Sequence, residues 1–148
     1  YYVWESSWEG KPDPQDGKTK LGVQITPFEE IYNTYKDDNS SIFLRRVSDN
    51  ANKLLTTENL SKVHEVVYFK PYDIVPKDWI EAAFRKDDKP QKTDRFWCAA
   101  LVGYIYTKCK LLDSATDWSK LAPVDFSTKR NDLVYRNNIT LGEEEQIL

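Results

Sequence analysis

The sequence predicts an α+β fold, in which a small antiparallel sheet packs on one buried central helix. Residues 96–106 are apolar or small at every position, and a helix that is apolar on all sides is a buried one. Residues 1–8 and 21–25 have the aromatic and alternating patterns of strands, and a loop rich in Gly, Pro and Asp joins them. Apolar residues at helical spacing then recur in residues 28–35 and 57–67.

Length and charge limit the classes of function. The chain has 148 residues, of which 40% are hydrophobic and 30% charged, so it can form one globular domain, residues 1–148, with its own core. Its net charge of −3 and scattered Lys and Arg argue against a nucleic-acid partner, which a basic surface would bind. The apolar run at 96–106 is too short to cross a membrane, which takes about 20 residues. We therefore expect no transmembrane segment and no signal peptide.

The N-terminal half is predicted to contain a hairpin, two helical regions and a third strand. The hairpin strands are residues 1–8 and 21–25, with an exposed loop between them. Thr26-Pro27-Phe28-Glu29 has the pattern of a capping box, and it should open a helix that ends near Tyr35. A third strand is expected at 41–47. Residues 50–67 should be helical in two pieces, the second starting near Thr57.

The C-terminal half is organised around the central helix. We expect this helix to run from about Asp94 to Leu112, capped by Thr93 or Asp94, with Leu101, Val102 and Ile105 in the core. Its small residues Ala99, Ala100 and Gly103 should let another backbone approach closely. The remaining expectations are a turn at 70–73, a short helix at 76–84, an extended segment at 122–127, final strands at 133–135 and 138–141, and a loose end at 146–148.

Cys98 is the leading candidate for a nucleophile. It falls in the first turn of the central helix, where unpaired backbone N–H groups and the helix dipole favour a thiolate. A free cysteine is also commonly a small core residue, so both interpretations remain open from position alone. Cys109 lies eleven positions later, about 16 Å along the helix axis, too far for a disulfide. We expect Cys109 in the core and the protein in a reducing compartment.

Three further polar residues have simpler structural interpretations. His64 is the only histidine, and its place among the valines of a predicted helix indicates a structural role. Glu5, in the middle of the first strand, is most simply a solvent-facing residue, and Asp125 a turn or cap. One histidine and two separated cysteines do not make a zinc site, and no phosphate-binding loop or Ser-His-Asp signature is present. We therefore expect no metal and no cofactor.

The order of several short motifs resembles that of a known family. The motifs are Val3-Trp4-Glu5-Ser6, residues 21–28, residues 43–47, Lys70-Pro71-Tyr72-Asp73, residues 96–102 and Pro123-Val124-Asp125-Phe126. Together they resemble the circularly permuted NlpC/P60 (papain-like) cysteine hydrolases, which include YiiX-type bacterial proteins, relatives of lecithin retinol acyltransferase and proteins of large DNA viruses. The resemblance covers most of residues 1–127 and implies a papain-like fold.

The resemblance also implies catalytic roles. By this likeness Cys98 is the nucleophile, and Glu5 matches the acidic position on the strand that follows the family's histidine strand, where it orients the imidazole. Ala99 stands where the family often has Ser. His64 does not match the position of the family's catalytic histidine, which precedes Glu5. We therefore expect a segment before Tyr1 that carries a histidine on a strand, pairs beside residues 1–7 and brings the histidine next to Cys98.

Three functions remain open at the level of sequence. The first is a cysteine (thiol) hydrolase that cleaves an amide or ester bond in a peptide, a peptidoglycan-type amide or a lipid. The second is a non-catalytic structural or scaffold protein, such as a virion component, that retains the fold and binds a protein partner along the edge of Tyr1–Ser7. The third is a lipid- or peptide-binding module that uses the cleft expected beside Cys98. The residue composition suits a large DNA virus, so we expect a reducing cytoplasm or a virion as the location.

Overall fold

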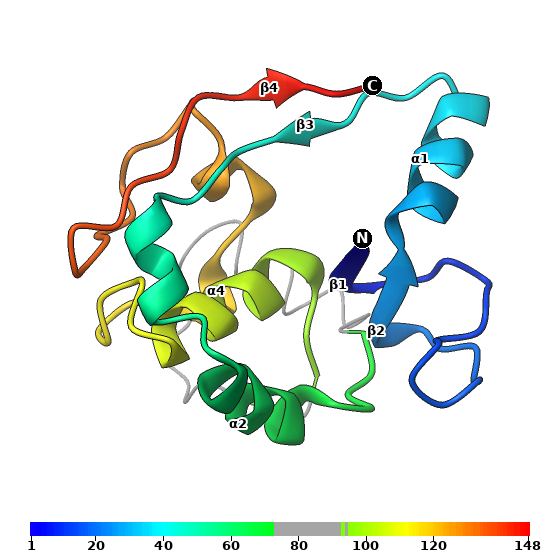
Figure 1. Ribbon diagram of the computed structural model, residues 1–148, viewed down its shortest axis with the longest axis horizontal. Coiled ribbons are helices and arrows are strands. Elements are labelled where there is room, and N and C mark those ends of the chain that lie inside the picture. Colours follow the sequence, from blue (N-terminus) through cyan, green and yellow to red (C-terminus); the bar gives the residue numbers. More distant parts are fainter. Residues whose placement is uncertain (73–92, 94) are drawn as a thin grey trace.

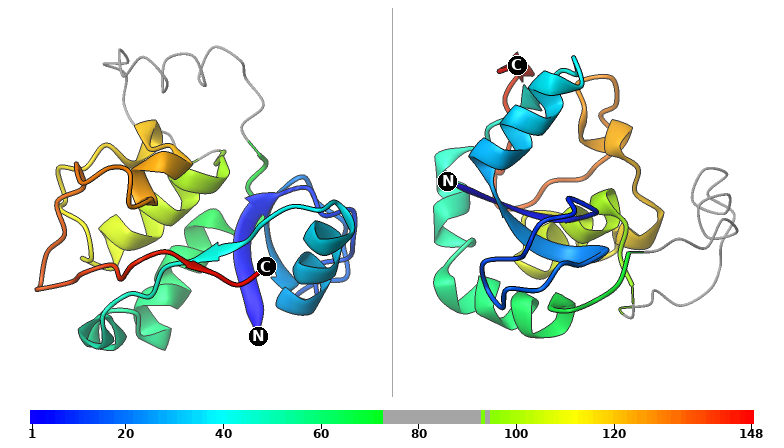
Figure 2. Two further views of the ribbon diagram at one scale, coloured as in Figure 1. Left: turned by 90° about the horizontal axis from the view of Figure 1, so that it is seen from above. Right: turned by 90° about the vertical axis from the view of Figure 1, so that its right-hand side faces the viewer.

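The computed structural model describes residues 1–72, 93 and 95–148, and its architecture is α+β. Helix α4 (Cys98–Lys108) lies in the middle of the molecule, with its N-terminal end next to strand β1 (Tyr2–Ser7) (Figure 1). The hairpin of β1 and β2 (Gly22–Pro27) and helix α1 (Phe28–Asp37) lie on one side of α4 (Figure 2). The other elements are α2 (Thr57–Val67), strands β3 (Phe43–Leu44) and β4 (Glu145–Gln146), and the 3₁₀ helices η1 (Asp49–Lys53), η2 (Trp118–Lys120) and η3 (Pro123–Phe126).

The hairpin is antiparallel, with Glu5 opposite Gln24. The outer edge of β2 is covered by the chain at residues 70–71, because the Val23 N–H donates to the Lys70 carbonyl at 2.9 Å. Gly22 permits this close approach: its φ is +149°, and a Cβ at this position would lie 2.3 Å from the Lys70 oxygen. Within the described part of the chain, β2 is the only strand that pairs with β1, so no strand covers the other edge of β1.

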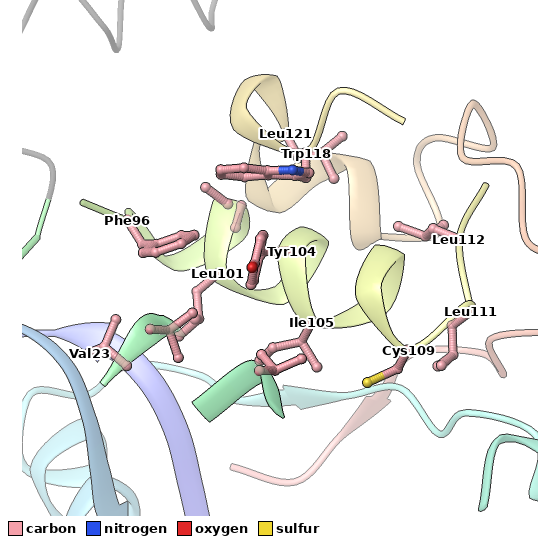
Figure 3. Close-up of a cluster of buried hydrophobic side chains, with 14 of the residues drawn as sticks. Val23, Phe96, Leu101, Tyr104, Ile105, Cys109, Leu111, Leu112, Trp118 and Leu121 are labelled. Carbon is pink, nitrogen blue, oxygen red and sulfur yellow. The ribbon is translucent and has the colours of Figure 1, made fainter. Parts of the chain in front are cut away.

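The core forms around α4, as its apolar sequence predicts. Leu101 is completely buried, and the ring of Phe96 stacks on Trp118 with a centroid distance of 5.5 Å (Figure 3). Gly103 lies directly beneath the segment after α4, since a Cβ there would be 2.6 Å from the Leu121 Cδ1 atom. The predicted close approach to the small residues of the central helix is therefore confirmed at Gly103.

The bounds of the central helix differ from the prediction. The helix begins at Cys98, and its N-cap is Trp97, with no side-chain cap, so the predicted cap at Thr93 is wrong. Asp94 lies outside the described residues. The helix ends at Lys108, because Lys110 adopts a φ of +64°, which a right-handed helix cannot accommodate. Val102 is only half-buried and lines a groove, so its predicted place in the core is also wrong.

Other helical predictions have mixed outcomes. The two-piece region at 50–67 is confirmed, and Thr56 caps α2 by accepting a hydrogen bond from the Asn59 N–H. The capping box before α1 is wrong, because the N-cap is Pro27 and makes no side-chain hydrogen bond. The extended segment at 122–127 is instead the 3₁₀ helix η3, where Asp125 accepts the Ala122 N–H. The predicted helix at 76–84 lies outside the described residues.

The C-terminal segment is a paired strand and not the loose end that the sequence suggested. Gln146 lies opposite Phe43 in the antiparallel β3–β4 ladder, in which β3 leads away from the end of α1 and β4 runs back toward it (Figure 1). The strands predicted at 133–135 and 138–141 form only isolated bridges, through Tyr135 to Leu112 and through Leu141 to Val47. The C-terminal residues thus contribute to one side of the groove described below.

Candidate functional site

Cys98 is held in place by contacts to the two residues before it. The Ser6 hydroxyl donates to the Phe96 carbonyl at 2.7 Å, and the Phe96 N–H donates to the Pro71 carbonyl at 3.1 Å. The Trp97 Nε1–H donates to the Leu121 carbonyl at 2.9 Å. Strand β1, the turn after α2 and the segment after η2 therefore fix the start of α4, while the Cys98 side chain itself is exposed.

The start of α4 also offers hydrogen-bond donors beside the sulfur. The first N–H groups of a helix have no partner within the helix, and here no side chain of the N-cap Trp97 takes one of them. The first intrahelical bond runs from the Leu101 N–H to the Trp97 carbonyl at 3.0 Å. The N–H groups of Cys98 and Ala99 are therefore placed where they can stabilise negative charge on a substrate oxygen.

A groove of about 810 Å³ begins at Cys98 and follows one face of α4. On the helix its lining residues are Cys98, Ala99, Val102 and Tyr106, so it extends roughly 12 Å along the helix axis. The facing wall comes from β3, from η3 and the residues after it, and from the C-terminal segment: Phe43, Arg45, Pro123, Val124, Phe126, Ser127, Lys129, Leu141 and Glu144.

Most polar groups in this wall already have partners in the protein. The Arg45 guanidinium donates to the carbonyls of Phe126 and Gly142 at 2.8 and 2.7 Å, and to that of Leu141 at 3.4 Å. The Ser127 hydroxyl donates to the Val124 carbonyl at 2.8 Å. Glu144 accepts the Thr128 N–H at 2.8 Å. The wall therefore presents mainly apolar surface to the groove.

Glu5 lies on β1 with its carboxylate half-buried, and it accepts a short hydrogen bond from the Thr26 hydroxyl. Burial raises the pKa of the Glu5 carboxyl; the hydrogen bond from Thr26 lowers it, and the neighbouring charge of Glu9 raises it further. Glu5 is not among the residues that line the groove. Its carboxylate is thus an acid whose ionised form is disfavoured by burial, with one oxygen bonded to Thr26.

The phenol of Tyr35 on α1 is influenced by charge on both Glu5 and Cys98. Burial raises the pKa of the Tyr35 phenol, and the charges of Glu9, Glu5 and Cys98 raise it further, in that order. Glu5 and Cys98 therefore both lie within electrostatic range of one phenol. In the part of the chain that the structure describes, no hydrogen bond joins Glu5 or Tyr35 to the sulfur of Cys98.

His64 and Cys109 have structural surroundings. The His64 Nε2 atom lies 2.6 Å from the Gln15 Oε1 atom, and the imidazole stacks on Tyr68 with a centroid distance of 4.9 Å. His64 is not a groove residue. Cys109 is 1% exposed, its side chain lies among the core residues shown in Figure 3, and burial raises the pKa of its thiol. The prediction that Cys109 is a core residue is confirmed.

Sequence reasoning expected a cleft at Cys98 but missed the course of the groove along α4, and it missed Tyr35. Cys98, Val102 and Tyr106 recur every four positions, a spacing that places them on one helix face. This signal was available, but the uniform apolarity of residues 96–106 hid it. Tyr35 gave no comparable signal, because its proximity to Glu5 and Cys98 depends on how α1 packs. Asp125, predicted as a cap, does cap η3, and it also pairs with Arg130 at 3.0 Å.

Comparison of the chain with protein-family models, with curated proteins and with solved structures gives no match. Among the described residues, no three His, Cys, Asp or Glu side chains are grouped so that they could bind a metal ion. In the same residues, every helix is too short or too polar to cross a membrane. The site must therefore be interpreted from its own geometry.

Proposed function

We propose that this protein is a thiol hydrolase that cleaves an amide or ester bond, with Cys98 as the nucleophile. The observation that carries the proposal is the position of Cys98: an exposed thiol on the first residue of a buried helix, at the end of a substrate-sized groove. A cysteine at a helix N-terminus, where the first backbone N–H groups have no partner within the helix, is suited to acyl transfer. Cys109 has none of these properties.

The reaction takes place in two steps. A base removes the thiol proton while the Cys98 sulfur bonds to the carbonyl carbon, and the N–H groups at the start of α4 stabilise the resulting oxyanion. The carbon–oxygen or carbon–nitrogen bond then breaks, and the leaving group takes the proton from the base. Water next attacks the thioester, the sulfur–carbon bond breaks, and the proton returns to the sulfur through the same base.

The base in this proposal is a histidine on a strand beside β1, which is where the family resemblance places it. The edge of β1 that no described strand covers supports this position, because a strand added there would lie next to the N-terminal end of α4. Glu5 would then orient the imidazole, as the third member of such a set does. His64 does not serve as the base, since it is engaged by Gln15 and Tyr68.

The test is turnover of an activated ester by the protein and by two matched cysteine variants. Cys98→Ala should abolish both turnover and the acyl-enzyme that mass spectrometry detects at early times, with little change in the melting temperature. Cys109→Ala is the matched control and should retain turnover. A protein that forms no acyl-enzyme with any ester or amide would overturn the proposal.

A non-catalytic scaffold is the second candidate function. The specific observation that favours it is that the Glu5 carboxylate accepts a hydrogen bond from the Thr26 hydroxyl and none from a group at Cys98 among the described residues. A scaffold would use the edge of β1 that no described strand pairs with for a protein partner, as exposed sheet edges do. Reactivity of Cys98 toward iodoacetamide no higher than that of a free thiol, together with absence of turnover, would favour this alternative.

A further inference from the structure

We propose that the groove along α4 binds the acyl chain of the substrate, so that the hydrolysed bond is a fatty acyl ester, thioester or amide. This inference rests on the proposed function, since Cys98 must be the nucleophile for the bound chain to be cleaved. It goes beyond that function because it selects one substrate class from several that a thiol hydrolase could accept.

The first argument is the path of the groove. It starts at Cys98 and continues past Val102 to Tyr106, a length of roughly 12 Å on one helix face. The Tyr106 ring meets the Phe126 ring edge-on, with centroids 6.0 Å apart, so the two sides of the groove come together there. A carbonyl carbon beside the Cys98 sulfur would therefore extend its own acyl chain along α4.

The second argument is the chemistry of the walls. A bound peptide needs partners for its backbone N–H and C=O groups, and leaving them unmet in an apolar groove is costly. The Arg45 guanidinium and the Ser127 hydroxyl are already bonded to carbonyls of the protein, and Glu144 accepts a backbone N–H. The remaining charged group of the lining is the Lys129 ammonium, a donor at one point that cannot pair the successive N–H and C=O groups of an extended peptide. An acyl chain makes no such demand, and its burial against Val102 and Val124 is favourable.

The binding test uses the Cys98→Ala variant, which cannot hydrolyse its ligand. The probes are neutral 4-methylumbelliferyl esters from acetate to decanoate, and their affinity is measured by isothermal titration calorimetry. Burial of each added methylene should raise the affinity about two- to fourfold until the chain outgrows the groove. An affinity that does not change with chain length would overturn the acyl-chain proposal.

Three substitutions in the Cys98→Ala background locate the bound chain. Val124→Asp places a charge in the groove wall and should weaken decanoate binding at least tenfold. The matched control is Val134→Asp, since Val134 is 54% exposed and is not a groove residue; it should change affinity less than twofold. If Val124→Asp folds poorly, Val102→Trp takes its place. The tryptophan fills the groove and should weaken decanoate binding by the same factor. Equal effects of the Val124 and Val134 variants would overturn the proposed location.

Kinetics of the protein with Cys98 intact separate the two proposals. Chain-length-dependent binding to Cys98→Ala without any hydrolysis by the intact protein would contradict the hydrolase while the acyl-chain site remains. Hydrolysis of the acetate as fast as that of the decanoate, without chain-length-dependent binding, would contradict the acyl-chain site while the hydrolase remains. Preferential binding or cleavage of a peptide substrate would also overturn the acyl-chain proposal. We expect kcat/KM to rise with chain length in parallel with affinity.

Discussion

The hydroxyl of Ser6 donates a 2.7 Å hydrogen bond to the backbone carbonyl of Phe96, and this buried contact joins β1 to the segment that leads into Cys98. Ser6 is fully buried and Phe96 is fully buried. The two residues are 90 positions apart in the sequence. One side chain of the hairpin therefore helps to determine where the candidate nucleophile lies.

Ser6→Ala should destabilise the protein by about 1–3 kcal/mol, because the Phe96 carbonyl would lose its side-chain donor in a site without solvent. The free energy of unfolding is measured by urea titration. The same substitution should reduce turnover more than substrate affinity, since it loosens the residues just before Cys98.

Ser7→Ala is the matched control for this prediction. The Ser7 hydroxyl donates to Glu9 in a partly exposed position and accepts from the Gln24 amide at 3.2 Å. Because the same Gln24 nitrogen also donates to the Ser7 carbonyl, removal of the hydroxyl should change the stability by less than about 1 kcal/mol. If Ser6→Ala and Ser7→Ala were equally mild, the Ser6–Phe96 bond would not be what holds the start of α4.

The burial of α4 could be predicted from sequence, but its starting residue could not. Residues 96–106 are apolar throughout, and this property alone requires a buried segment. The start at Cys98 depends on contacts of Phe96 and Trp97 with Ser6 and Leu121, which are distant in sequence. Local capping rules favoured Thr93 or Asp94 because they take no account of such tertiary contacts.

The groove could be predicted only in part. The helix face of Cys98, Val102 and Tyr106 is visible in the spacing of these residues. The facing wall is not, because the sequence of η3 looked extended and the C-terminal strand looked like a loose end. Both elements form through non-local contacts, such as the bond from Arg45 to the Phe126 carbonyl. The neighbourhood shared by Glu5, Tyr35 and Cys98 depends on the same kind of packing.

The two thiols should differ strongly in reactivity. Cys98 is exposed, whereas Cys109 is 1% exposed and burial raises the pKa of its thiol. In the native protein, iodoacetamide should therefore modify Cys98 and leave Cys109 unmodified over the same interval, as measured by peptide mass spectrometry. In urea the two rates should become similar. Faster modification of Cys109 than of Cys98 in the native protein would contradict the assignment of Cys98 as the accessible thiol.

The loop of the hairpin should contribute to resistance against acid. Asp16 accepts hydrogen bonds from the Lys20 ammonium at 2.8 Å and from the Tyr68 hydroxyl at 2.6 Å, and these lower its pKa to about 2. Because the folded-state pKa is below the ordinary value of 3.8, the stabilisation is complete above pH 4 and is lost as the pH falls toward 2. Asp16→Asn should lower the free energy of unfolding at pH 7 and flatten its dependence on pH below 4.

The matched control for Asp16→Asn is Asp132→Asn, since Asp132 is exposed. This variant should unfold at the same urea concentration as the unmodified protein at pH 7, and its stability should fall with acid as steeply. A pH dependence of Asp16→Asn as steep as that of the unmodified protein would exclude the Asp16–Lys20–Tyr68 contacts as its cause.

Glu5→Gln should make the protein more stable at neutral pH and less active. Burial raises the pKa of Glu5 above its ordinary value of 4.5, so ionisation of the carboxyl opposes folding. The contribution of Glu5 to the free energy of unfolding should therefore fall as the pH rises from about 4.5 through the raised pKa of the folded state. Above that pKa the loss of stability is complete and stays constant. Glutamine has no charge to bury and can still accept the hydrogen bond from Thr26.

Urea titrations at pH 4 and pH 8 should show a gain in stability for Glu5→Gln only at pH 8. The control Glu29→Gln, on the exposed side of α1, should show no gain at either pH. A gain at pH 8 combined with lost turnover is expected of a residue retained for function at the expense of stability. Equal stabilities at both pH values would mean that the Glu5 carboxylate is not strained in the folded protein.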